Sequence, residues 1–103
     1  MPTYVLLSNL TDEGAKALKT NPKRLQEVNK EIEKFGAKVT QQYAVLGPYD
    51  FVSIVECPDN ETIARVSVEL ASRGSIRLMT LAATPVANFI RTLKTREDRK
   101  SVV

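Results

Sequence analysis

Apolar residues along this chain follow two spacings, one typical of strands and one typical of helices. Runs rich in β-branched and aromatic residues occupy residues 3–9, 37–46, 50–57 and 75–83, and such runs predict strands. Between the first two runs, and again between the last two, apolar residues recur three and four positions apart, which predicts helices. The pattern therefore predicts the order strand, helix, strand, strand, helix, strand.

The first helical region carries start and stop signals. Thr11 or Asp12 can cap a short helical turn, and Pro22 interrupts it because proline suits the first turn of a new helix. The main helix is predicted from about Pro22 to Phe35, with Gly36 as its expected C-terminal stop.

The second half of the chain carries similar signals for helix starts. Asp59 or Asn60 is the expected cap of the second main helix, and a short closing helix is predicted over residues 85–93. We expect one domain over residues 1–94, similar in length to many single domains, followed by a flexible basic tail over residues 95–103.

The β-α-β-β-α-β order with a C-terminal helix predicts an α+β, ferredoxin-like sandwich. Both faces of its sheet are apolar, although helices are expected to cover only one of them. An uncovered apolar face favours association, and a second copy related by two-fold symmetry is the simplest partner. We therefore predict a homodimer or higher homo-oligomer built as a dimeric α/β barrel. The apolar strand residues are Val5, Leu7, Phe51 and Val55 at odd positions and Leu6, Val52 and Ile54 at even ones.

A hairpin is predicted at the centre of the chain, over residues 43–55. Its two apolar runs flank Gly47-Pro48-Tyr49-Asp50, which predicts a tight turn, because Pro48 fixes the backbone angle that a type I turn needs there. In this interpretation the Asp50 carboxylate accepts hydrogen bonds from backbone N–H groups. The alternative interpretation places Asp50 at the mouth of a cleft, as a general base or ligand anchor.

The amino-acid composition excludes several kinds of catalytic and metal site. The chain has 103 residues, a net charge of +3, one cysteine and no histidine. Without histidine the commonest general base and most zinc and iron sites are excluded, so we expect no metal and no cofactor. A single cysteine excludes an intramolecular disulfide framework, and Cys57 lacks a histidine to activate it. No signal peptide or membrane span is evident, so we expect a cytoplasmic protein.

Several segments, in the right order, are similar to the GYD-domain family. The resemblance covers about residues 2–92 and implies a ferredoxin-like fold and a dimeric α/β barrel, but little about activity. Met79 and Ala82 depart from the family pattern, in which polar or charged residues are more usual at these positions. The similar segments are Pro2-Thr3-Tyr4-Val5-Leu6-Leu7, Leu10-Thr11-Asp12-x-Gly14, Pro22-Lys23-Arg24-Leu25 and Gly47-x-Tyr49-Asp50-Phe51-Val52.

Few polar residues are available on the predicted strands to hold a small molecule. Their odd numbering predicts one shared face, on which they would line the barrel with Phe51; alternatively they are ordinary core and rim residues. The candidate ligand-binding residues are Gln41, Tyr43, Ser53 and Arg77, and the candidate catalytic residues are Asp50, Tyr43 and Arg77.

Three functions follow from these features. The first is a small-molecule binding or regulatory module, and the second is a cofactor-independent oxygenase or isomerase acting on a small organic substrate in the barrel. The third is RNA binding, because RRM domains share this element order. Tyr49 and Phe51 match the aromatic positions of that motif, but Asp50 would repel phosphate, which argues against nucleic acid.

Overall fold

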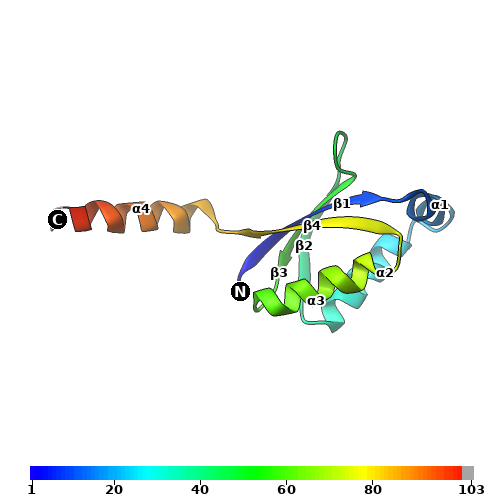
Figure 1. The fold of residues 1–103 in the computed structure, drawn as a ribbon, viewed down its shortest axis with the longest axis horizontal. Helices are drawn as coiled ribbons and strands as arrows, with labels where there is room; N and C mark the ends of the chain where they lie inside the picture. The colour runs from blue at the N-terminus through cyan, green and yellow to red at the C-terminus, as the bar shows by residue number, and fades with distance from the viewer. Residues whose placement is uncertain (101–103) are drawn as a thin grey trace.

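The computed structural model describes the backbone of residues 1–100 and the side chains of residues 1–94 (Figure 1). Residues 101–103 of the predicted basic tail lie outside this range. Within it the strands pair antiparallel in the order β2-β3-β1-β4, which confirms the predicted ferredoxin-like fold. The elements are β1 (Thr3–Leu10), α1 (Asp12–Thr20), α2 (Arg24–Lys34), β2 (Lys38–Ala44), β3 (Phe51–Glu56), α3 (Asn60–Ala71), β4 (Ile76–Ala83) and α4 (Val86–Lys100).

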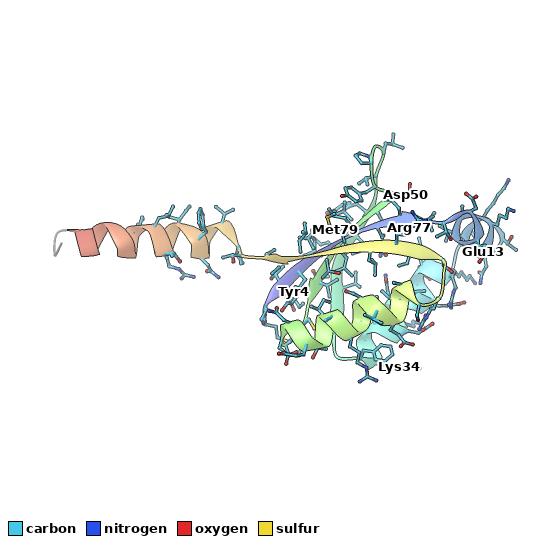
Figure 2. The ribbon with its side chains drawn as sticks, in the orientation of Figure 1. Tyr4, Glu13, Lys34, Asp50, Arg77 and Met79 are labelled. Atoms are coloured by element: carbon cyan, nitrogen blue, oxygen red, sulfur yellow. The ribbon has the colours of Figure 1, made fainter. Side chains whose placement is uncertain are left out.

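The helices α2 and α3 cover one face of the sheet (Figure 2). The core lies between them and the strands, and alternate residues of β1 and β3 point into it because side chains of a strand alternate between its faces. Val55 and Val66 at its centre have 0% and 1% of their surface exposed. The buried apolar cluster comprises Tyr4, Leu6, Ile32, Ala37, Val55, Cys57, Ile63, Val66 and Leu70.

The opposite face of the sheet is open, since none of the helices described in residues 1–100 packs on it. Its middle row crosses all strands through the paired residues Tyr43, Val52, Leu7 and Met79. Met79 and Leu81 are 48% and 42% exposed, which is high for large apolar side chains. The prediction of an uncovered apolar face is therefore confirmed for the single chain.

Helix α1 is a regular helix of nine residues, whereas the sequence predicted only a short turn. Thr11 caps it: its side-chain oxygen accepts a hydrogen bond from the Gly14 N–H at 3.1 Å. Gly14 also allows the helix to approach the strand that follows α3, because a Cβ at this position would lie 2.0 Å from the Ser75 carbonyl oxygen. The close contact between the backbones of Gly14 and Ser75 thus holds α1 against the start of β4.

Strand β2 contains a β-bulge at Thr40. The register moves from Val39 opposite Val55 to Gln41 opposite Ile54, and the Thr40 hydroxyl donates to the Ile54 carbonyl at 3.1 Å. An extra residue in one strand reverses the faces of the residues that follow it. Side chains before and after Thr40 therefore cannot be assigned to faces by one odd-even rule.

The ends of two elements differ from the predictions. The connection between β2 and β3 is a six-residue loop over 45–50, closed by the Val45 N–H donating to the Asp50 carbonyl at 2.9 Å, and not a tight turn. Helix α4 extends to Lys100, beyond the predicted 85–93, and projects away from the sheet as a separate arm (Figure 1).

No helix within the described residues is both long and apolar enough to cross a membrane.

Candidate functional site

Asp50 fastens the hairpin loop to the end of β1. Its Oδ2 accepts the Leu10 N–H at 2.8 Å, while its backbone N–H donates to the Ser8 carbonyl at 2.9 Å. These are the backbone contacts expected from the structural interpretation of this residue, because a carboxylate that replaces water at an unpaired N–H stabilises the strand end. Beside it, the Tyr49 hydroxyl lies 3.6 Å from the Met79 sulfur.

The predicted ligand-binding residues do not share one face. Gln41 and Tyr43 lie on the open face at the β2 edge, where the Tyr43 hydroxyl donates to Gln41 Oε1 at 3.4 Å. Arg77 is exposed on β4, at the other edge, with β3 and β1 between. Three strand spacings separate these edges by about 14 Å. A compact ligand would therefore not reach both groups within one chain.

Ser53 lies on the covered face, with 6% of its surface exposed. The parity that grouped it with Gln41 and Tyr43 was wrong, because the bulge in β2 changes the alternation. Its partner is Gln42, whose Nε2 donates to Ser53 Oγ at 3.0 Å, and Asn29 Nδ2 of α2 donates to Gln42 Oε1 at 2.9 Å. This chain of hydrogen bonds thus links helix α2, through the edge strand β2, to strand β3.

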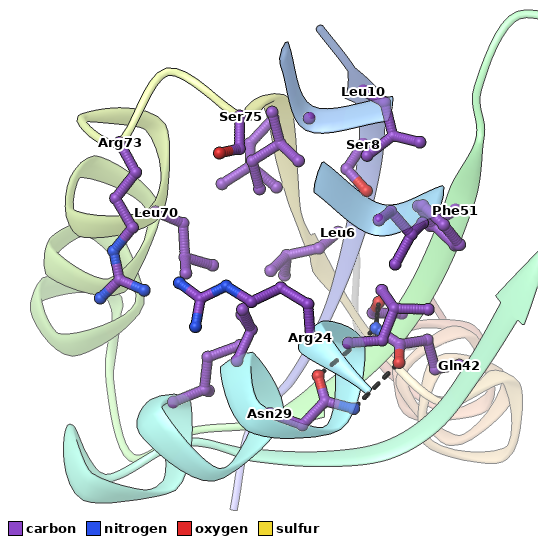
Figure 3. Close-up of a pocket in the computed structure, with 18 of the residues that line it drawn as sticks. Leu6, Ser8, Leu10, Arg24, Asn29, Gln42, Phe51, Leu70, Arg73 and Ser75 are labelled. Carbon is purple, nitrogen blue, oxygen red and sulfur yellow. Dashed lines mark hydrogen bonds between the residues drawn. The ribbon is translucent and has the colours of Figure 1, made fainter. Parts of the chain in front are cut away.

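This chain of hydrogen bonds borders a cavity of about 120 Å³ between the sheet and the helices (Figure 3). Most of its wall is apolar, and the wall residues come from α1, α2, α3 and all the strands. The sequence did not predict this cavity, although Asn29 interrupts the apolar stripe of α2 and gave one available signal. Its apolar wall includes Leu6, Phe51 and Leu78 from the sheet and Leu18, Leu25 and Val28 from the helices.

Two arginines line the cavity on the side opposite Gln42: the Arg24 guanidinium points away from Gln42, toward the side where Arg73 lies (Figure 3). Arg24 begins α2 and Arg73 follows α3, and Glu31 joins them: its carboxylate oxygens lie 3.4 Å from Arg24 Nη1 and 2.6 Å from Arg73 Nη1. The hydrogen bond from Arg73 holds the pKa of Glu31 below its usual value. Arg73 also pairs with Glu69 at 3.7 Å, so three carboxylates balance the two guanidiniums, but of these five groups only the arginines line the cavity. This side of the cavity reaches the surface, since the Arg24 side chain is 43% exposed.

Cys57 is fully buried in the core at the end of β3. Burial raises the pKa of its thiol, which lowers the fraction of reactive thiolate. Among the residues whose side chains are described, no three His, Cys, Asp or Glu residues gather in a way that would hold a metal ion.

Comparisons with known proteins place the chain in a family. A curated relative from Thermus thermophilus, named glutamine synthetase and cystathionine beta-lyase binding protein, is 58% identical over 95 residues, which cover 91% of this chain and all of that protein. The crystal structure of TTHA0845, from the same organism, superposes with a TM-score of 0.55 at 26% identity, covering 82% of this chain and 95% of the other. The family model of the GYD domain matches residues 4–93. The chain belongs to the GYD-domain family.

Proposed function

We propose that this protein is a homo-oligomeric regulatory module that binds enzymes of amino-acid metabolism, with glutamine synthetase and cystathionine beta-lyase as its partners. The observation that carries the proposal is the 58% identity to a relative named for binding these two enzymes, over the full length of that relative. Asp50, the residue first considered as a catalytic base, is engaged by backbone groups, and this favours binding over catalysis.

The open face of the sheet is the proposed contact between copies of the chain. A patch of partly exposed Val, Leu, Ile and Met side chains has a free-energy cost in water of about 25 cal/mol per Å². A two-fold axis would place the same patch of a second chain against it, which forms the dimeric α/β barrel. The patch comprises Val5, Leu7, Val52, Ile54, Met79 and Leu81.

Helix α4 is the proposed contact with the enzymes. It projects from the sheet (Figure 1), and its apolar side chains recur three and four residues apart on one side. Such a stripe suits docking of a helix in an apolar groove. The stripe residues are Val86, Phe89, Ile90 and Leu93, which are 68%, 53%, 44% and 46% exposed.

Binding to immobilised glutamine synthetase and cystathionine beta-lyase of the source organism tests the proposal. The wild-type chain should bind at least one of them, and Phe89→Asp should weaken binding about tenfold or more, because a charge would enter an apolar contact. Ala87→Asp adds the same charge outside the stripe and should bind like the wild type. Failure of the wild-type chain to bind either enzyme would contradict the proposal, and equal binding by both variants would remove α4 from it.

A further inference from the structure

We propose that the cavity between the sheet and helices α1, α2 and α3 is a binding site for a small organic acid with a compact apolar body, such as an aromatic monocarboxylate. The inference does not depend on the proposed enzyme partners, because it concerns a ligand held inside a single chain. It rests on the size of the cavity, on a serine hydroxyl that opens onto the cavity and has no protein partner, and on the two arginines.

The size of the cavity suits one ring or one branched aliphatic group. Its volume is about 120 Å³, somewhat below the roughly 150 Å³ of an engineered apolar cavity that stays dry and binds benzene. Native cores contain few voids larger than a water molecule. An apolar space of this size leaves its wall without packing partners, and a ligand of matching shape would restore them.

Ser8 supplies an unsatisfied polar group on the cavity wall. It is 7% exposed, projects from β1 into the cavity (Figure 3), and has no hydrogen-bond partner for its hydroxyl among residues 1–94. Every fully enclosed side-chain oxygen or nitrogen in that part of the chain does have a partner. The Ser8 hydroxyl is therefore not enclosed by protein and opens onto the cavity, where water or a ligand can reach it. A hydroxyl or carbonyl on the ligand would supply that partner.

The arginine side of the cavity offers hydrogen-bond donors for an anion, because Glu27, Glu31 and Glu69, which pair with the arginines, do not line the cavity. Arg24 and Arg73 are the charged residues that line the cavity within the described part of the chain. The contacts of Arg24 with Glu27 and Glu31 both use Nη1 at 3.4 Å, which leaves its Nε–H and its Nη2 protons available. A guanidinium presents donors in a planar fork that matches a carboxylate. An acid whose ring fills the apolar space would place its carboxylate at this end.

The end of the cavity at Gln42 offers a ligand no free polar group. Gln42 there already bonds to Ser53 and Asn29, so these groups form a closed polar wall and do not require a ligand. The available donors are consequently Ser8 and Arg24, on different sides of the apolar space. An aromatic acid with a hydroxyl opposite its carboxylate has the matching pattern.

Titration of the full chain with benzoate, 4-hydroxybenzoate and neutral benzyl alcohol, followed by protein NMR shifts, tests the inference. Benzoate should bind at millimolar concentration or below and more tightly than benzyl alcohol, with shifts at cavity residues. Arg24→Gln should weaken benzoate binding about tenfold, since a hydrogen bond to a charged group is lost. Lys23→Gln removes a neighbouring exposed charge that does not line the cavity and should have no effect.

Two further variants separate the site from general surface binding. Ala17→Phe places a ring at the exposed edge of the cavity on α1 and should weaken benzoate binding, whereas Ala64→Phe adds the same ring at an exposed position of α3 that does not line the cavity and should not. Ser8→Ala should weaken 4-hydroxybenzoate more than benzoate and keep the fold, because it removes an unpartnered hydroxyl. Absence of benzoate binding, equal binding of benzyl alcohol, or unchanged binding by Arg24→Gln or Ala17→Phe would overturn the inference.

Discussion

The two faces of one sheet have opposite environments although their residues are similar in type. On the covered face, Val55 has 0% of its surface exposed and packs beneath the helices; on the open face, Leu81 is 42% exposed. Hydrophobic residues alone therefore do not tell which face forms the core. The difference indicates that the covered face supplies stability and an internal cavity, whereas the open face is the one that the proposed association would cover.

The covered face is itself uneven. Around Val55, Val66 and Ile63 the packing is closed, with at most 3% of each residue exposed. Near α1 and the first turn of α2, Leu18 and Leu25 remain half-buried and border the cavity. A protein interior is normally packed as densely as an organic crystal. The loosely packed end of the covered face is thus the part of the core that a ligand would complete.

The strongest test of the comparison uses adjacent leucines of β1. Leu6 is 3% exposed on the covered face, and Leu7 lies on the open face. Leu6→Ala should lower the free energy of unfolding by about 2–5 kcal/mol at every protein concentration. Leu7→Ala should cost about 1 kcal/mol in dilute protein, since full burial of a leucine contributes about 1.5–3 kcal/mol.

Denaturant unfolding at low and high protein concentration distinguishes the two variants. A buried dimer contact adds stability by mass action, so the loss in Leu7→Ala should grow with protein concentration. A loss in Leu7→Ala that is large and independent of concentration would mean that the two faces do not differ as described.

A smaller effect is expected at the hairpin loop. Asp50→Ala removes the acceptor of the Leu10 N–H and should lower the free energy of unfolding by about 1–3 kcal/mol, the cost of leaving a donor without its partner. Binding of glutamine synthetase or cystathionine beta-lyase should not change. Asp50→Asn keeps an acceptor oxygen and should retain most of the stability. Loss of binding by a fully stable Asp50→Ala protein would instead make this residue part of a site.

The smallest effect is a pH dependence at the rim of the cavity. The hydrogen bond from Arg73 lowers the pKa of Glu31 from its ordinary value of 4.5. The folded state therefore binds this proton less readily than the unfolded state. The stability is present above the ordinary pKa and is lost as the pH falls through the lowered value. Glu31→Gln should make this acid limb shallower in thermal unfolding, with the remainder due to Asp59, whose pKa is lowered by hydrogen bonds from Thr62. Glu33→Gln, on an exposed position of the same helix, should leave the limb unchanged.

The sequence predicted the element order because each element carries its own local signal. The caps at Thr11 and Asp59 and the stop at Gly36 are where the pattern placed them. The grouping of candidate residues failed at Ser53, because odd or even numbering does not carry a face from one strand to the next: Leu6 pairs with Ser53 on β3 but with Thr80 on β4. The bulge at Thr40 shifts β2 as well, and neither the register nor the bulge leaves a mark in the spacing of one strand. The cavity was unpredictable for a similar reason, since it depends on how far the helices stand from the sheet.

The association state of the chain in solution tests the central claim most directly. Light scattering at micromolar concentration should give at least twice the 11.5 kDa of a single chain, because the proposed association pairs the open faces of two copies. The same measurement on Leu81→Asp, which places a charge on that face, should give a single chain that remains folded. A wild-type mass of one chain at all concentrations would contradict the division of the sheet into a core face and an association face.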